Sequence, residues 1–436
     1  MSEENKELRP ERHDRAWPLY GAALMMAVSL SMAWTAMPFV LSKMGGTNAH
    51  VGYAPAVNTL AYMIALLVTG SRFGHLSVRR TTLSAATAAL FATAMMSFCV
   101  LWAELRADAD SRTWIWTLIV AGGVGGAAMA LYWPFLMSWV SADYEGVQLN
   151  RRFGRYNGAW SSGGTIGPLI GGWLFEVNAV LPLAIAVIFV LLSLLLLSFG
   201  RDGSDRRVGL APPEPIGPGE SVGQAPPYMR IAYDMRLLAD CRWISRVALF
   251  SVCACYAIVR SQFALVFTGR GYTESQFGVY LTIYALCNFA ALVAAGRWAL
   301  WHFKPALLMV GQAMLLLTML LTIYGRTFGV FLVSSVLLGM AYGFAYCSHL
   351  YYGASASRKR SARMAIHEIV ISLGLTIGSF AGGYLAEHVG MYAPYWFAVG
   401  VVTLGMVGQM AIHLAAQTRV ALHRQAPTPT GAETAE

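Results

Sequence analysis

Most of this chain consists of long apolar stretches separated by short polar or charged turns. A helix needs about 20 mostly apolar residues to cross a hydrocarbon layer roughly 30 Å thick, and many stretches have that length. Hydrophobic residues make up 57% of the chain and charged residues only 12%, whereas soluble domains carry about a quarter charged residues. The sequence therefore predicts an integral membrane protein that crosses the bilayer many times.

The apolar stretches, bounded by charge or by Gly and Pro, form two groups of six. We expect the first six spans near residues 17–41, 51–71, 81–103, 113–141, 158–176 and 179–199. We expect the second six near residues 243–268, 275–296, 303–324, 328–354, 363–387 and 391–417. The predicted fold class is an all-α membrane protein with twelve transmembrane helices in two six-helix bundles.

A polar segment rich in Pro and Gly separates the two groups of spans and is expected to be a flexible linker. Its last part, IAYDMRLLADCRW, is expected to form a short interfacial helix. The predicted organisation is a cytoplasmic amino terminus (1–16), a bundle (17–199), a cytoplasmic linker (200–242), a second bundle (243–417) and a disordered cytoplasmic tail (418–436).

The distribution of basic residues predicts the orientation, because Lys and Arg that flank spans are retained in the cytoplasm. With the amino terminus inside, the outer loops hold only Lys43, Arg106, Arg112, Arg270 and Arg326. The first residues contain no apolar core, so no signal peptide is expected. We predict a multi-pass protein of the plasma (inner) membrane with both termini in the cytoplasm.

The formal net charge of +9 does not indicate nucleic-acid binding, because the basic residues are scattered among loops rather than gathered on one face. The six cysteines lie in apolar stretches or near the linker, which predicts free thiols rather than disulfides. Cys253 and Cys255 offer too few ligands for zinc. We expect neither a metal nor a cofactor.

The two halves of the sequence are similar to each other. A shift of 226 residues aligns Thr47 with Thr273 and Gly52 with Gly278, in the second span of each half. A shift of 211 residues aligns TIGPLIGGWLFE, from Thr165, with TIGSFAGGYLAE, from Thr376. Matching spans at the same rank in each half are typical of the parallel repeats of transporters.

Two similar six-helix halves joined by a long linker resemble the major facilitator superfamily, over essentially the whole chain except the termini and the linker. The resemblance implies a monomer whose two bundles rock about a central site and expose it first to one side of the membrane and then to the other.

The most specific local match fits the pattern G-x8-G-x3-G-P-x2-G-G and resembles the fifth-helix motif of drug/proton antiporters of this family. It consists of Gly154, Gly163, Gly167, Pro168, Gly171 and Gly172. Glycines spaced by four let a neighbouring helix approach closely, and a proline lets the helix bend. The second half keeps a similar face in Gly374, Gly378, Gly382 and Gly383, with Ser379 in place of the proline. These residues are expected to serve helix packing and a hinge.

The segment from Gly70 to Arg80 resembles the family's G-x-L-A-D-R-x-G-R-R loop, which helps to close a cytoplasmic gate. Gly74 stands where the family has Asp. Gly70, Arg79 and Arg80 are candidates for a gate loop because the segment matches the family's loop in its position and its basic end. Without the carboxylate that normally pairs charges at the gate, the two arginines also fit pairing with acidic groups or lipid phosphates, or a role as simple topology signals.

Ionisable residues within spans are costly and are functional candidates by default. Arg260 is a candidate for binding an anionic group of a substrate; the alternative is that its side chain snorkels to the interface. Glu368, with His367 and His349, is a candidate for proton coupling; the alternative is a structural carboxylate at a helix amino terminus. The first span contains no charged residue, although many proton-coupled relatives place a carboxylate there.

Uncharged polar and aromatic residues within spans complete the set of candidates. Asn58 and Asn288 occupy similar positions in the repeat and are expected either to bind substrate or to link helices. Aromatic candidates for the wall of a cavity are Tyr132, Trp133, Trp160, Tyr256, Tyr284 and Tyr346.

The sequence shows no phosphate-binding loop and no zinc-spaced cluster of His and Cys, so we do not expect an enzyme. We predict a secondary transporter, with proton-coupled efflux of a small amphiphilic or drug-like molecule as the preferred function. The alternatives are uptake or facilitated diffusion of an anionic metabolite and a sensor or assembly protein that does not transport. The expected partners are a small solute, protons and membrane lipids.

Overall fold

The computed structural model describes residues 16–70, 76–106, 111–141, 146–200, 235–355 and 360–425. The amino-terminal segment, most of the linker, residues 71–75 of the candidate gate loop and the end of the tail lie outside the described residues. The first half contains α1 (Trp17–Lys43), α2 (Asn48–Gly70), α3 (Val78–Leu105), α4 (Ser111–Ser141), α5 (Gly146–Val177) and α6 (Leu181–Phe199). The second half contains α7 (Met235–Ile258), η4 (Val259–Phe263), α8 (Ala264–Gly269), α9 (Glu274–Arg297), η5 (Ala299–Trp301), α10 (Pro305–Tyr324), α11 (Phe328–Ala354), α12 (Arg360–His388) and α13 (Ala393–Gln425).

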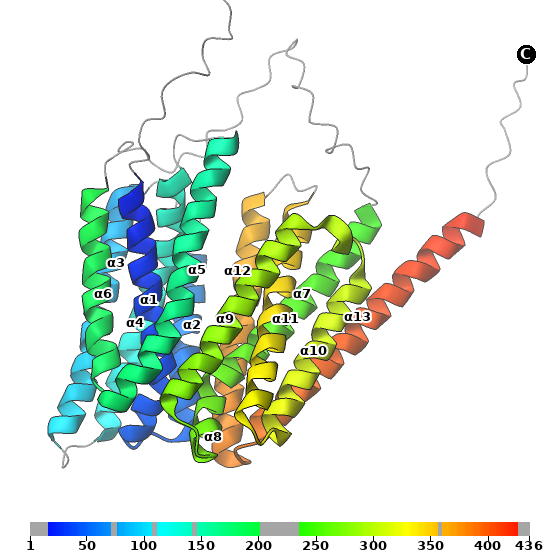
Figure 1. The fold of residues 1–436 in the computed structure, drawn as a ribbon. Coiled ribbons are helices and arrows are strands. Elements are labelled where there is room, and N and C mark those ends of the chain that lie inside the picture. Colours follow the sequence, from blue (N-terminus) through cyan, green and yellow to red (C-terminus); the bar gives the residue numbers. More distant parts are fainter. Residues whose placement is uncertain are drawn as a thin grey trace, which may run out of the picture.

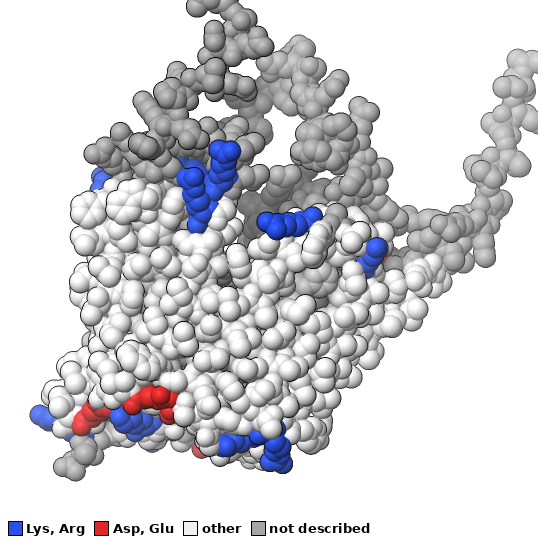
Figure 2. Space-filling view, in the orientation of Figure 1, with Lys and Arg blue, Asp and Glu red and all other residues white. Residues whose placement is uncertain are grey.

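Within the described residues, 11 helical segments are long and apolar enough to cross a membrane, with α7, η4 and α8 forming one of them. The remaining long helix is α5, which spans 32 residues but carries three arginines and many glycines. On the face shown in Figure 2, charged side chains lie near the two ends of the bundle and an uncharged band lies between them. The predicted all-helical membrane architecture is confirmed.

Several helix boundaries differ from the predicted ones, most of all at the starts of α5 and α7 and at the end of α13. Helix α5 begins at Gly146, twelve residues before the expected start of the fifth span at 158. The helix that contains the seventh span begins at Met235, eight residues before the expected start. Residues 235–243 of the segment expected to be a separate interfacial helix are therefore continuous with the span, and residues 231–234 lie outside the described residues. Leu238, Cys241 and Ile244 are buried along one face of this extension, which joins it to the core. The last helix continues to Gln425, beyond the expected end at residue 417.

The helices α1–α6 lie side by side in one half of the molecule, and α7–α13 form the other (Figure 1). We call the end at which α1 begins the proximal side, and the end at which α1 ends and α2 begins the distal side. The second half has a large core cluster around Phe263, Phe267 and Phe277. The first half has two, one around Met37 and one around Tyr132.

Glycines let two helix pairs pack backbone to backbone, one pair in each half. On α5, a Cβ atom added at Gly163 or Gly167 would meet the backbone of α1 near Leu24 and Val28. On α12, a Cβ atom at Gly374 would lie 2.8 Å from the carbonyl oxygen of Phe250 on α7. The remaining glycines of these faces, Gly171, Gly378 and Gly382, also face α1 or α7. The equivalent pairs α1/α5 and α7/α12 show that the sequence repeat is also a structural repeat.

The two halves meet through α2 against α12 and through α5 against α9. Gly52 packs on Gly383, and Gly172 packs on the backbone of Glu274 and Ser275 at the distal side. Further along, the hydroxyl groups of Thr59 and Thr376 lie 2.9 Å apart, and Thr282 donates a hydrogen bond of 3.1 Å to the carbonyl oxygen of Thr165. Thr165 and Thr376 are aligned in the repeat, so each half contributes an equivalent threonine to the interface.

Candidate functional site

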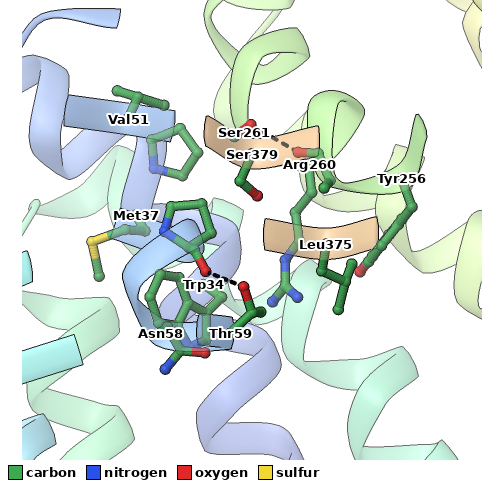
Figure 3. Close-up of a pocket in the computed structure, with 13 residues that line it drawn as sticks. Trp34, Met37, Val51, Asn58, Thr59, Tyr256, Arg260, Ser261, Leu375 and Ser379 are labelled. Atoms are coloured by element: carbon green, nitrogen blue, oxygen red, sulfur yellow. Dashed lines mark hydrogen bonds between the residues drawn. The ribbon is translucent and has the colours of Figure 1, made fainter. Parts of the chain in front are cut away.

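A cavity of about 70 Å³ lies between the two halves. Its walls come from α1 and α2 of the first half and from α7, η4 and α12 of the second half (Figure 3). The lining residues are Trp34, Met37, Pro38, Val51, Pro55, Asn58, Thr59, Tyr256, Ala257, Arg260, Ser261, Leu375 and Ser379. Because both halves contribute to the wall, a relative movement of the halves changes the shape of the cavity.

Arg260 is the charged residue of this cavity wall. Its side chain is half-buried, and Figure 3 shows the guanidinium group reaching from η4 toward Thr59. The Cζ atom of Arg260 lies 5.8 Å from the centre of the Tyr256 ring, close enough for a cation–π contact. Within the described part of the chain, the guanidinium group makes no hydrogen bond and no ion pair.

The backbone around Arg260 leaves the regular α-helix. Residues Val259–Phe263 form a π-helical turn, a rare element that often occurs at functional sites. Ser261 donates a hydrogen bond of 2.7 Å to the carbonyl oxygen of Ala257, and Gln262 donates one of 3.2 Å to Asn48 across the interface of the halves. Sequence reasoning missed this turn, although three successive polar residues in an apolar span are a signal for it.

The two candidate asparagines have different surroundings. Asn58 lines the cavity, and its Nδ2 atom donates a hydrogen bond of 2.7 Å to the carbonyl oxygen of Gly122 on α4. Asn288 lies outside the cavity wall and packs against Gly343 on α11. Its Oδ1 atom is buried and has no hydrogen-bond partner among the described residues. Asn58 therefore both links helices and faces the cavity.

Of the six aromatic candidates, only Tyr256 lines this cavity. Tyr284 lies behind Tyr256, and the two rings are stacked with their centres 4.6 Å apart. Tyr346 packs against His367, further toward the proximal side. Tyr132 is fully buried within the first half and shares a hydrogen bond of 2.9 Å with Ser193. Trp133 and Trp160 contact each other edge to face at 6.4 Å. The cavity also uses Trp34, which the sequence analysis did not single out.

The three candidates for proton coupling are neighbours but face different helices. The Tyr62 hydroxyl on α2 donates a hydrogen bond of 3.3 Å to Oε2 of Glu368 on α12. His349 and His367 are buried, and their Nδ1 atoms lie 2.8 Å apart, so one ring donates a proton to the other. Nε2 of His367 is buried and has no hydrogen-bond partner among the described residues. Glu368 thus links the two halves, whereas the histidine pair lies within the second half.

The candidate gate loop is only partly described. Gly70 ends α2, and a Cβ atom there would have no neighbour within 4 Å. The Nη2 atom of Arg79 donates a hydrogen bond of 3.4 Å to the carbonyl oxygen of Ser198 at the end of α6, and Arg80 is exposed. Gly154 of the α5 motif also has open space around it, unlike Gly163 and Gly167.

All six cysteines are free. Among the described residues, no group of three or more His, Cys, Asp or Glu side chains is arranged to hold a metal ion.

Two repeated six-helix bundles around a cavity that both of them line define a membrane transporter built from parallel repeats. The sequence matches the family model of the Major Facilitator Superfamily over residues 19–356 and again over residues 247–434. The chain belongs to the major facilitator superfamily, as the motifs suggested, and it is a transporter rather than an enzyme. A comparison with curated protein sequences gives no match.

Solved structures share this fold. The nucleoside transporter NupG superimposes with a TM-score of 0.69 at 12% identity, over 92% of this chain and 99% of that chain. A POT family transporter in complex with a thioalcohol-conjugated peptide gives a TM-score of 0.67 at 14% identity, over 92% and 96%. A bacterial homologue of the human lysosomal transporter Spinster, in an inward-facing and occupied conformation, gives 0.64 at 12% identity, over 97% and 100%. At sequence identities of 12–14%, the similarity to these structures shows a shared fold only.

Proposed function

We propose that this protein exports a small amphiphilic solute in exchange for protons, and that the solute binds in the cavity between α1, α2, α7, η4 and α12. The observation that carries the proposal is the joint wall of this cavity, with Trp34, Met37 and Asn58 from one half and Tyr256, Arg260 and Leu375 from the other. A solute held by both halves favours one arrangement of the halves over another, and such differential binding is what drives alternating access.

Glu368 is proposed as the proton carrier. Its hydrogen bond with Tyr62 crosses from α12 to α2, so a change in its charge alters a contact between the two halves. The histidine pair His349 and His367 is proposed to hold a further proton, because His367 directly precedes Glu368 on α12. The direction of transport rests on the resemblance of the α5 glycine motif to that of drug/proton antiporters.

The purified protein should be reconstituted into vesicles that contain a pH-sensitive dye, and amphiphilic drugs and organic acids should be loaded inside in turn. When the solute leaves the vesicle, an antiporter brings protons in and acidifies the lumen. A symporter would instead make the lumen more alkaline, and solute flux without a pH change would identify facilitated diffusion. Binding without flux for every solute would reject transport and favour a sensor.

A further inference from the structure

We infer that the solute is a small amphiphilic monoanion whose anionic group binds Arg260. This inference rests on the proposed function, because it names the class of solute for the same cavity. An arginine within a membrane span normally pairs with an acidic group or with backbone carbonyl groups. Arg260 makes no such pair with any described residue, and no Asp or Glu lines the cavity. A bound anion would provide the missing partner.

The position of Arg260 argues against snorkelling of its side chain to the membrane surface. The helix continues for nine residues beyond it, to Gly269, which corresponds to roughly 14 Å at 1.5 Å per residue. Its guanidinium group instead reaches into the cavity toward Thr59 (Figure 3). The π-helical turn at Val259–Phe263 sets the backbone of Arg260 apart from the regular helix on either side. The orientation of the guanidinium group and the π-helical turn both fit a side chain that is positioned to bind a ligand.

The charge of the cavity sets the charge of the solute. Among the described residues that line the cavity, Arg260 is the one cation. A carboxylate matches the planar guanidinium group and can accept two parallel hydrogen bonds from it. A second negative charge on the solute would be desolvated without a partner, which is costly. The cavity therefore favours a monoanion over a dianion.

The rest of the wall sets the body of the solute. Apolar side chains from both halves, including Met37, Val51 and Leu375, surround the cavity, and Trp34 and Tyr256 add aromatic rings. Several polar groups of the wall are already bonded within the protein: the Thr59 hydroxyl contacts Pro55 and Thr376, the Ser261 hydroxyl bonds to Ala257, and the Asn58 amide nitrogen bonds to Gly122. Few polar groups are therefore left for a solute. A sugar-like body would leave hydroxyl groups unpaired. The volume of about 70 Å³ corresponds to about five water sites, which suits a solute with one ring.

The test compares benzoate, benzamide and benzylamine, which share a ring and differ in charge, together with the dianion terephthalate and with chloride. Their binding to the purified full chain is measured by calorimetry and by the shift in melting temperature. We expect benzoate to bind best. In the Arg260→Gln variant, benzoate binding should weaken roughly 30-fold or more, because a desolvated charge pair loses one partner, while benzamide binding stays unchanged. Arg326→Gln, which removes an exposed positive charge outside the cavity, should leave benzoate binding unchanged.

The melting temperature of the Arg260→Gln variant without ligand shows whether it is folded, and Arg260→Lys, which keeps the charge, should retain part of the benzoate binding. The inference would be overturned if benzamide or benzylamine bound as tightly as benzoate. It would also be overturned if the Arg260→Gln variant bound benzoate as tightly as the wild type does. If chloride or terephthalate bound as tightly as benzoate, the solute would not be an amphiphilic monoanion. A complete lack of benzoate binding would also overturn the inference. Benzoate binding that depends on Arg260 but drives no flux would keep this site and reject the proposed transport instead.

Discussion

The Tyr62 hydroxyl donates a hydrogen bond of 3.3 Å to Oε2 of Glu368, and this contact joins α2 of the first half to α12 of the second half. Tyr62 follows Asn58 and Thr59 of the cavity wall by one helical turn, and Glu368 precedes the cavity residue Leu375 by two turns. The proposed proton site is therefore separate from the proposed solute site but is connected to it through the same two helices.

Replacement of Glu368 by Gln should abolish proton coupling and spare solute exchange. Glutamine keeps an oxygen that can accept the hydrogen bond from Tyr62, but it cannot take up or release a proton. We expect solute-driven proton movement in vesicles to fall to the background of empty vesicles, while counterflow of labelled solute keeps the wild-type rate. Glu387→Gln, at an exposed position on the same helix, is the matched control. Equal loss of both activities would mean that Glu368 is needed for structure or gating instead.

Addition of a methyl group to α5 should destabilise the protein at Gly167 but not at Gly164. A Cβ atom at Gly167 would meet the Ser31 hydroxyl and lie 2.8 Å from the carbonyl oxygen of Val28, whereas one at Gly164 has no neighbour within 4 Å. Overpacking costs about 1–3 kcal/mol, so Gly167→Ala should lower the melting temperature in detergent. Gly164→Ala should leave it unchanged or raise it, because alanine favours the helix by up to about 1 kcal/mol. Equal melting temperatures for both variants would contradict the backbone contact between α1 and α5.

The fold was predictable because two simple patterns determine it. Lengths of apolar sequence fix the number of spans, and the repeat of TIGPLIGGWLFE as TIGSFAGGYLAE indicates that α5 and α12 are equivalent. The start of α7 was harder to predict, because Asp240 and Arg242 make that segment look interfacial. Burial of Leu238 and Cys241 on one face extends the helix regardless.

The site was predictable only in part. Arg260 and Asn58 stood out because polar residues in spans are rare, and both line the cavity. Asn288 stood out for the same reason, yet it packs against Gly343, because the repeat aligns helices without fixing which side chains reach the centre. Trp34 resembles an ordinary core residue in sequence, and Ser379 stood out only as the replacement of a proline. Only the meeting of the two halves places both of them on one cavity.

Acidification should weaken the native state through His302, which lies between η5 and α10 outside the spans. Its ring stacks on Tyr351 at 3.9 Å, and burial lowers the pKa of His302 below 6.5. The folded protein then binds fewer protons at this site than the unfolded chain, so stability falls as the pH drops through about 6.5 toward the lower native pKa. The loss of melting temperature between about pH 8 and pH 5.5 should be smaller in His302→Gln than in the wild type. The same loss in both proteins would show that His302 does not contribute.

Arg270 should be important for the stability of the second half, although its place in the sequence suggested only an outer loop. Its Nη1 atom donates hydrogen bonds of 3.0 and 3.1 Å to the carbonyl oxygens of Thr322 and Gly325, and its Nη2 atom donates one of 2.8 Å to Ile323. These carbonyl groups belong to the carboxyl-terminal end of α10, where a cation is favourable.

Arg270→Gln shortens the side chain and removes the charge, so the three carbonyl groups lose their donor. Hydrogen bonds to charged groups contribute about 1.5–3 kcal/mol each, and partial replacement by water leaves an expected loss of about 2–4 kcal/mol. The melting temperature of the variant in detergent should therefore fall clearly below that of Arg326→Gln, which removes an exposed charge two residues after the end of α10. If the two variants have the same melting temperature, the carbonyl groups of α10 do not need Arg270 as a hydrogen-bond donor, and water satisfies them equally well.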